Sequence, residues 1–298
     1  MPPRLILLCT GAFLFCSMLP APAQMDDFTD GNDDGWTRFD PIGTLVNSPY
    51  ALHQVQSGQY RLSCDPSPDP SAVGPARVGS YRADTTLTNF TVVVDVVSWN
   101  AALDQSFGLL ARLQSNPGPG TLAGYALNYQ PGDQDIEINR LVNEAPVNLA
   151  RVASNLAPGE AYRFVFTGQG TQLQAAVYNI ADPLRPLVTV AAEDAAFTAG
   201  HCGVFGYDTS NTGAVNVTFD SYTAGPASVP VLSFVASSSD FTVGWPRLTG
   251  AWHLEASTDP ALWSDVTAGG AAAGAGISHT EMLAGRKFFR MAPGWRSP

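Results

Sequence analysis

The sequence has few basic residues and almost no lysine. Of its 298 residues, 15 are Lys or Arg against 26 Asp or Glu, and Lys287 is the one lysine. A chain this acidic repels phosphate backbones and anionic lipid heads, so nucleic acids and membrane surfaces are poor partner classes. Neutral or cationic ligands fit better.

A run long enough to span a membrane is also missing. The apolar stretch behind Arg4 is shorter than the roughly 20 residues that a bilayer requires, and Ala21-Pro22-Ala23 is a small-x-small cleavage site. We therefore expect residues 1–23 to be a secretory signal peptide and not an anchor. The mature chain would have 14 basic against 26 acidic residues, and would be secreted or periplasmic without membrane insertion.

Cysteine is scarce, and two of the four cysteines leave with the signal peptide. Cys64 and Cys202 remain, and in an oxidising compartment they could form one disulfide that stabilises by about 2–4 kcal/mol. The alternative is two separate buried thiols that never come within bridging distance. We expect the disulfide. The lack of further Cys or His partners nearby argues against a zinc site.

Common catalytic signatures are absent too. The sequence contains no Gly-x-Ser-x-Gly, no His-Glu-x-x-His and no phosphate-binding glycine loop. Its four histidines are scattered without the spacing of metal ligands. No segment combines helical periodicity with capping residues, so helix should be a minor component.

What the chain does contain is a series of short alternating runs. Apolar side chains occur at every second position, or as β-branched runs, in residues 86–99, 106–114, 124–130 and 135–142. These runs are typical of neighbouring strands in an antiparallel meander, and similar runs continue to about residue 224. A sheet of this size must bury one face against another sheet, so the pattern predicts an all-β jelly roll or sandwich.

A change of composition marks the end of this region. AGPASVP is small, uncharged and proline-containing, which is typical of an interdomain linker. A second set of short strand-like runs follows it. We therefore divide the chain into a signal peptide (1–23), a jelly-roll domain (24–224), a linker (225–231) and a small immunoglobulin-like β-sandwich module (232–298).

Family resemblances are carried by runs of this kind. The first region, with DDFTDGNDDGWTRFDP, TNFTVVVDVVSW, QSFGLLARL and FDSYTAG, resembles secreted bacterial domains of the concanavalin A-like lectin/glucanase, or laminin G-like, jelly roll. Its opening segment also resembles 3-keto-disaccharide hydrolase-type domains, although SFGLLAR stands where those have an Asn-Ser-Gly-Ile-type strand. The tail, with FTVGW, WHLEASTD and RKFFRM, is similar to a shortened fibronectin type III or immunoglobulin-like module. These resemblances imply a fold more than an activity.

The stretch DGNDDGWT, residues 30–37, places oxygen-bearing side chains at alternate positions before a glycine, as a calcium loop does. The twelfth position of an EF-hand would be Glu and is Pro41 here, which excludes that motif. Two interpretations stay open: a solvated acidic turn, or a structural calcium site completed by the neighbouring last strand. No other cofactor is expected. The candidate ligands are Asp27, Asp30, Asn32, Asp34 and Asp220.

Asp133, Asp135 and Glu137 alternate along one strand face, which is similar to the Glu-x-Asp-x-Glu strand of laminarinase-type glucanases. That resemblance implies Asp133 as the nucleophile and Glu137 as the acid/base. A retaining hydrolase needs its two carboxyls about 5–5.5 Å apart, whereas positions i and i+4 of a strand lie about 13 Å apart. The alternative is a polar strand face that begins at a hairpin.

A third candidate site follows from strand facing. If the four runs are neighbouring strands, the face opposite Phe107 and Leu109 is concave and has room for a ligand. Asp95 lies between valines and needs a partner, for which we expect Arg112, either as a structural pair or as part of the site. Two rings could stack on a sugar. The candidate ligand-binding residues are Asp95, Trp99, Arg112, Asn128 and Tyr129.

The sequence therefore favours a secreted bacterial two-module protein that binds a carbohydrate or another extracellular or cell-surface ligand. One alternative is a glycoside hydrolase that uses the same face, laminarinase-like or 3-keto-disaccharide hydrolase-like. Another is a structural envelope protein without catalysis. The incomplete carboxylate triad counts against the enzyme.

Overall fold

The computed structural model describes most of residues 23–293, and every structural statement below concerns those residues. The predicted signal peptide lies outside them except for Ala23. The residues that are not described are 1–22, 115–116, 184–185, 228–231, 237–239, 247–251, 260–261, 267–270, 274–275, 283–286 and 294–298.

The first layer, sheet A, is an antiparallel sheet of eight strands. Its strands are, in spatial order, β13 (Val188–Glu193), β12 (Gln172–Asn179), β11 (Tyr162–Gln169), β6 (Phe90–Trp99), β15 (Val215–Pro226), β4 (Gln59–Cys64) and β3 (Leu52–Gln56), with β1 (Gln24–Asp26) beside β15. The first and last strands of the sandwich are thus neighbours, as expected.

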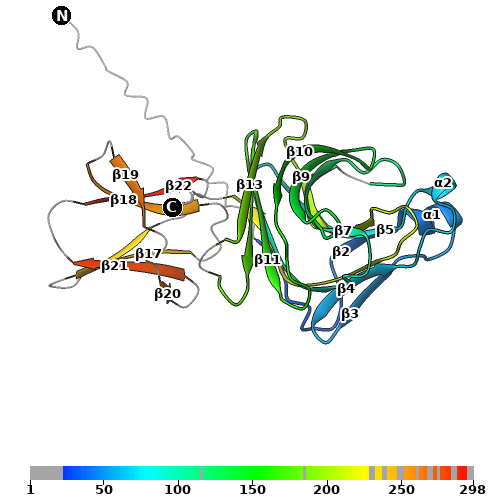
Figure 1. The fold of residues 1–298 in the computed structure, drawn as a ribbon, viewed down its shortest axis with the longest axis horizontal. Coiled ribbons are helices and arrows are strands. Elements are labelled where there is room, and N and C mark those ends of the chain that lie inside the picture. The colour runs from blue at the N-terminus through cyan, green and yellow to red at the C-terminus, as the bar shows by residue number, and fades with distance from the viewer. Residues whose placement is uncertain are drawn as a thin grey trace, which may run out of the picture.

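The second layer, sheet B, is antiparallel with seven strands. Their spatial order is β10 (Ala145–Ala153), β9 (Asp135–Val142), β8 (Gly124–Gln130), β7 (Gln105–Leu113), β14 (Gly200–Asp208), β5 (Arg77–Leu87) and β2 (Trp36–Phe39). Figure 1 shows this layer strongly curved, with β9 and β10 at one end of the curve and β5 and β2 toward the other.

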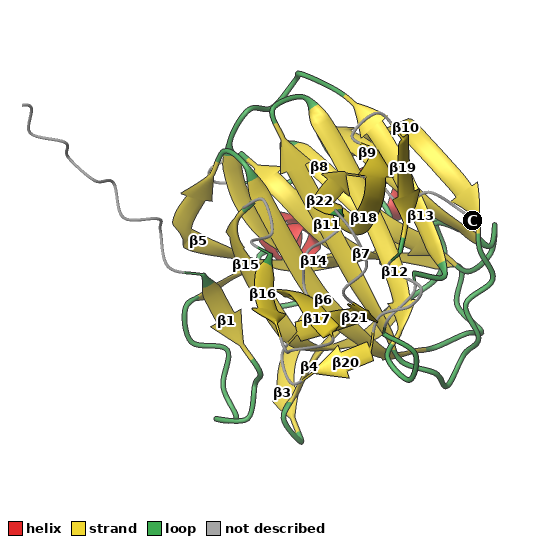
Figure 2. Cartoon of the chain, turned by 90° about the vertical axis from the view of Figure 1, so that its left-hand side faces the viewer, coloured by secondary structure: helices red, strands yellow, loops and turns green. Residues whose placement is uncertain are grey.

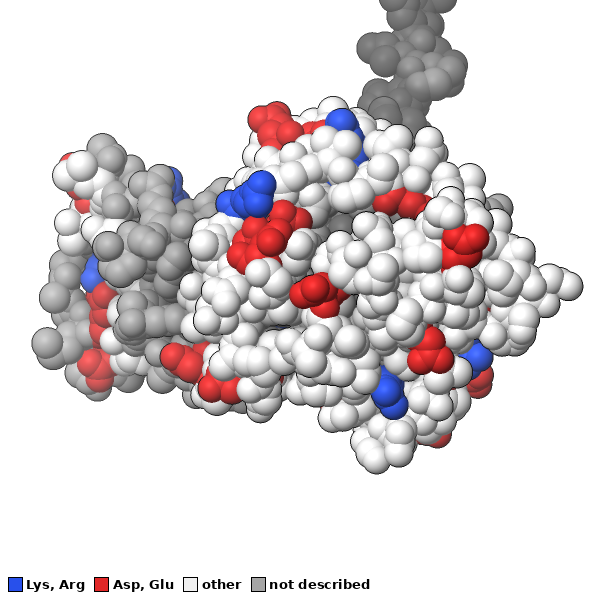
Figure 3. All heavy atoms as spheres, turned by 45° about the vertical axis from the view of Figure 1, so that its right-hand side comes forward, with Lys and Arg blue, Asp and Glu red and all other residues white. Residues whose placement is uncertain are grey.

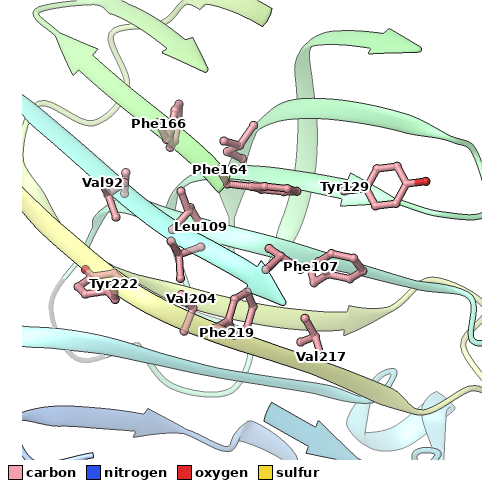
Figure 4. Close-up of a cluster of buried hydrophobic side chains, with 14 of the residues drawn as sticks. Val92, Phe107, Leu109, Tyr129, Phe164, Phe166, Val204, Val217, Phe219 and Tyr222 are labelled. Atoms are coloured by element: carbon pink, nitrogen blue, oxygen red, sulfur yellow. The ribbon is translucent and has the colours of Figure 1, made fainter. Parts of the chain in front are cut away.

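The two sheets close on one hydrophobic core. Because strand side chains alternate between faces, each strand sends every second residue inward, among them Val92 and Phe164 from sheet A and Phe107 and Leu109 from sheet B (Figure 4). All four are fully buried. Burial of such a side chain stabilises the fold by about 1.5–3 kcal/mol, so this interior is the main source of stability.

Helix is a minor component, as the sequence predicts (Figure 2). Helix α1 (Pro41–Val46) begins where the Asp40 side chain accepts a hydrogen bond from the Gly43 amide. Helix α2 (Pro70–Val73) has Asp69 in the same capping role. In both, proline follows the cap at a position that needs no amide donor. No helix in the described segments is long and apolar enough to cross a membrane.

The C-terminal part contains two smaller antiparallel sheets. Val243 from one and Leu254 from the other are fully buried in a shared cluster, so these sheets also face each other. One sheet has the order β16 (Ser233–Ala236), β17 (Asp240–Pro246), β21 (Gly276–Met282) and β20 (Ala271–Ala273), and the other β19 (Leu262–Asp265), β18 (Trp252–Asp259) and β22 (Phe288–Pro293).

The predicted all-β antiparallel fold class is confirmed. Strands β8 and β9 have the bounds of the predicted runs 124–130 and 135–142, and β7, β8 and β9 are neighbours as expected. One pairing is wrong: β6 does not lie beside β7 but belongs to the other sheet, between β11 and β15. Chain order suggested a continuing meander, whereas the chain crosses between layers after Trp99. The predicted domain end at 224 falls inside β15, which continues to Pro226.

Candidate functional site

A hollow lies on the concave face of sheet B, the face turned away from the main core. Its floor and walls come from all seven strands of the sheet and from the loop before β8. Among the residues that line it are Phe39, Leu110, Asn128, Glu137, Asn139 and Phe205. Figure 3 shows the surface turned by 45° from the view of Figure 1. On this face charged side chains are sparse, and acidic ones are more frequent than basic ones.

One cross-strand row of the concave face has no side chain at its glycine, and we call this position the gap. Phe205, Gly108, Asn128 and Glu137 stand in one cross-strand row, each paired with the next across β14, β7, β8 and β9. A Cβ at Gly108 would lie 2.1 Å from the backbone oxygen of Leu127, so only glycine permits this close strand approach. The row thus places a ring on one side of the gap and an amide and a carboxylate on the other.

The polar side of the gap is held rigid by its own hydrogen bonds. The Asn139 side-chain amide donates to Asn128 Oδ1 at 2.8 Å and to Glu137 Oε2 at 2.9 Å. Asn148 Nδ2 in turn donates to Asn139 Oδ1 at 3.2 Å. Asn128 and Asn139 are buried, whereas Glu137 is half-buried. A preorganised amide and carboxylate of this kind can accept hydrogen bonds from ligand hydroxyls without losing further side-chain entropy.

A second apolar cluster covers the other half of the concave face. It is separate from the main core and includes Phe39, Leu110, Leu122, Ala126 and Leu141, all buried, with Phe205 against them. These side chains make the hollow amphipathic, with one apolar wall and one polar wall.

An ion pair spans the face. Arg77 in β5 and Glu144 in the β9–β10 turn meet at 2.9 Å, and both side chains line the hollow. Four strand spacings separate β5 from β9 in the sheet order, which is roughly 19 Å in a flat sheet. The pair therefore forms only because sheet B curls and its hairpin leans over the concave face. We call this pair the clasp.

Two of the three sequence-predicted carboxylates share the concave face. Asp135 and Glu137 alternate with Ile136 and Ile138, which face the core. Burial, and then the neighbouring Glu137, raises the pKa of Asp135, while Arg151 opposes this. Asp133 lies in the exposed turn before β9 and accepts a hydrogen bond from Gln130. The predicted nucleophile is thus placed on the turn and not on the strand face.

Asp95 and Arg112 do not pair, and that prediction is wrong. Asp95 lies on the outer face of sheet A, where Arg163 from the adjacent β11 donates to both carboxylate oxygens at 2.7 and 2.8 Å. This contact raises the pKa of Arg163. Asp95 therefore has its partner within its own sheet and does not reach the hollow.

Arg112 lies at a β-bulge, which sequence periodicity does not reveal. Strand β7 has one residue more than β14 between Leu110 and Leu113, and Arg112 takes φ 46° there. The bulge returns Leu113 to the concave face and turns Arg112 toward the core, where its guanidinium donates to the backbone oxygens of Thr88, Gly170 and Phe197 at 2.8–2.9 Å. Arg112 is 1% exposed and joins three loops.

The two predicted stacking rings belong to the main core. Trp99 and Tyr129 pack edge to face at 5.9 Å, and Figure 4 draws Tyr129 among the buried side chains of this core. The rings that line the hollow are Phe39, Phe205 and Tyr207 instead. Alternation within CGVFGYD could have placed Phe205 and Tyr207 on one face, but nothing in the sequence says which face is concave. Asn128 is the one predicted ligand-binding residue that lines the hollow.

The acidic opening stretch uses its oxygens inside the turn. Asp27 accepts from the amide and hydroxyl of Thr29, which lowers its pKa. Asp30 accepts from the Asn32 amide, and Asn32 from the Asp34 amide. Asp220 accepts from the Ser221 amide on β15. No group of three or more His, Cys, Asp or Glu side chains in the described segments is arranged to hold a metal ion. The calcium site stays a prediction.

The predicted disulfide is not formed. Cys64 in β4 and Cys202 in β14 are free, buried thiols in opposite sheets. Burial raises the pKa of each to about 12, so both stay protonated and unreactive at neutral pH. The alternative of separate buried thiols is the one that the structure contains.

Comparisons with known proteins give structural likeness only. No protein-family model and no curated protein sequence matches the chain. Among solved structures, the carbohydrate-binding module CBM66 from Bacillus subtilis matches 65% of this chain and 97% of its own at 14% identity and a TM-score of 0.47. A prokaryotic β-1,3-1,4-glucanase (lichenase) from a mouse hindgut metagenome matches 68% and 99% at 12% identity and a TM-score of 0.48. Basic winged bean lectin with Tn-antigen matches 68% and 97% at 10% identity and a TM-score of 0.46.

Proposed function

We propose that this chain is a secreted bacterial carbohydrate-binding protein that holds a neutral sugar in the hollow of sheet B. The observation that carries the proposal is the row of Phe205, Gly108, Asn128 and Glu137, which sets an aromatic ring and a fixed polar pair on either side of a gap. A sugar has apolar C–H groups on one side and hydroxyls around its edge, so it matches a ring and a polar pair together.

Export and modular organisation are part of the proposal. Residues 1–23 would direct the chain to the periplasm or medium. The strands after residue 232 would act as a fibronectin type III or immunoglobulin-like spacer or docking module. The sugar could belong to a soluble glycan or to a cell surface, and neither nucleic acid nor a metal has a part in the site.

A glycan array with the full chain tests the proposal. Asn128→Ala removes the amide that faces the gap and should weaken binding about tenfold or more, because a buried ligand hydroxyl would lose its hydrogen-bond partner. Gln172→Ala, at an exposed position on β12 of the other sheet, is the matched control and should bind as the parent does. Equal binding by both variants would place the ligand elsewhere.

A glycoside hydrolase is the second candidate. It is favoured by Glu137, a half-buried carboxylate that lines the hollow two residues from Asp135, whose pKa is raised by burial. Such a pair could donate and accept a proton. The predicted nucleophile, Asp133, lies on the exposed turn and not on the strand face, so no residue is assigned as the nucleophile. A reducing-sugar assay decides: turnover that Glu137→Gln abolishes supports the enzyme, and binding without turnover supports the first proposal. If the protein neither binds a glycan on the array nor releases reducing sugar, a structural envelope role remains.

A further inference from the structure

The division of the hollow into two walls restricts the sugars that fit. Leu110, Ala126 and Leu141 are 2%, 1% and 8% exposed on a face that would otherwise be open to solvent. They belong to the second apolar cluster and not to the core between the sheets. A hydroxyl placed against this wall would lose its water without gaining a partner.

The polar wall lies immediately beside the apolar one. Ala126 pairs with Asn139, and the next concave pair along β8 and β9 is Asn128 with Glu137. Two residues along a strand cover about 7 Å, so a single sugar ring contacts both walls. One edge of the ring then meets an amide and a carboxylate while another meets hydrocarbon.

The charges around the hollow exclude an anionic ligand. Arg77 is the one basic residue among the described residues that line it, and it is engaged by Glu144 at 2.9 Å. Glu137 adds a second carboxylate to the lining. A uronate or sulfate would meet net negative charge with no cation available to it.

We propose, on the basis of the proposed function, that the hollow selects a neutral sugar that carries an apolar substituent. The substituent lies against Leu110 and Leu141, and the ring hydroxyls donate to Glu137 and Asn128. The methyl group of a 6-deoxy sugar and the methyl group of an acetamido sugar share this chemistry. An unsubstituted hexose would bury a bare hydroxyl at the same place.

Matched pairs of immobilised glycosides test this inference and separate the two sources of the methyl group. The pairs are L-rhamnoside with L-mannoside, L-fucoside with L-galactoside, and N-acetylglucosaminide with glucoside, with a glucuronide as the anionic probe. We expect the substituted member of at least one pair to bind about tenfold or more tightly than its parent, as for one methyl group in a fitted pocket. The glucuronide should not bind.

Variants of one wall residue assign the discrimination to the apolar half. Leu141→Asn should reduce the preference within the pair to less than about threefold, because the new amide satisfies the hydroxyl of the parent sugar. Leu141→Met keeps the wall apolar and should keep the preference, which controls for misfolding. Leu187→Asn, an exposed leucine away from the hollow, should leave it unchanged.

The outcomes distinguish this inference from the proposed function. Binding of both members of every pair with equal affinity, lost in Asn128→Ala, would overturn the inference and leave sugar binding intact. Preference for a substituted sugar that Leu141→Asn does not change would place the substituent elsewhere and also overturn it. Absence of binding to every glycan would remove the proposed function and the inference with it.

Discussion

The two faces of sheet B each contain a buried arginine, and the two arginines differ in what they contact. Arg112, toward the core, places each of its three guanidinium nitrogens on a backbone oxygen. Arg77, on the concave face, pairs with Glu144, yet Arg77 Nε and Glu144 Oε1 are buried without a hydrogen-bond partner among the described atoms. Arg77 Nη1 does donate to the backbone oxygens of Val73 and Pro75. The guanidinium of Arg112 is thus fully satisfied, and the clasp is not.

This difference indicates which face is adapted for a ligand. Buried polar groups in a stable interior are hydrogen-bonded almost without exception, and the core face of sheet B follows that rule at Arg112. Unsatisfied groups concentrate at sites that bind or move. The clasp, with its two unpaired atoms, is therefore consistent with a concave face that is adapted for a ligand.

The largest effect is expected at Arg112. Arg112→Ala leaves three backbone oxygens without their donor and should lower the free energy of unfolding by about 3–5 kcal/mol, measured by urea denaturation. Arg112→Lys should recover little, because one ammonium group does not reproduce the planar guanidinium that reaches three loops. Arg151→Ala, whose side chain is 62% exposed with one contact at 3.4 Å, is the control. An unchanged unfolding midpoint in Arg112→Ala would remove the structural role.

A smaller effect is expected at the clasp. Removing one partner of a buried pair costs about 3–5 kcal/mol, and the partial exposure of Glu144 should reduce this to about 1–3 kcal/mol. A double-mutant cycle with Arg77→Gln and Glu144→Gln measures the coupling directly. The control pair is Arg38 with Asp33 at 2.8 Å, in which Arg38 is 55% exposed, and we expect a coupling of about 0–1 kcal/mol there. Equal coupling in the two cycles would mean that the clasp is an ordinary surface pair.

The sequence predicts the fold of this chain better than its site, and the reason is physical. Alternating hydrophobicity reports that a residue belongs to a strand, so β8 and β9 are predicted with their observed bounds. Alternation does not report which strand lies alongside, and for this reason Asp95 was assigned to the wrong sheet. It also fails at a bulge, where one extra residue reverses the facing and moves Arg112 from the concave face to the core.

Even on a correctly ordered strand, only one of two adjacent predicted residues can face the hollow, and Tyr129 of β8 faces the core. Asn128 lies on β8, between two strands that are correctly ordered, and it lines the hollow. Trp99 lies on β6, in the other sheet, and its ring is in the core. Phe39 and Phe205 reach the hollow from β2 and β14, which are remote in sequence from β8. Contacts of that kind depend on the topology, which short-range patterns do not contain.

The smallest expected effect concerns the acidic end of the concave face. Asp135 is 5% exposed, and its Oδ1 has no hydrogen-bond partner among the described residues. Burial and Glu137 raise the pKa of Asp135 in the folded state above the 3.8 of the free side chain. The folded protein therefore binds this proton more tightly than the unfolded chain, so the carboxylate destabilises the fold at neutral pH. That penalty disappears as the pH falls through the folded-state pKa toward 3.8.

Asp135→Asn removes the charge and keeps the shape of the side chain. The variant should be more stable than the parent by about 0.5–1 kcal/mol at pH 7, and the difference should shrink toward zero as the pH approaches 4. Urea unfolding at several pH values measures both trends, and Asp133→Asn on the exposed turn of the same hairpin serves as the matched control. A variant less stable than the parent at pH 7 would show that the contact of Asp135 with Arg151 outweighs the cost of burial, and the carboxylate would then stabilise the concave face.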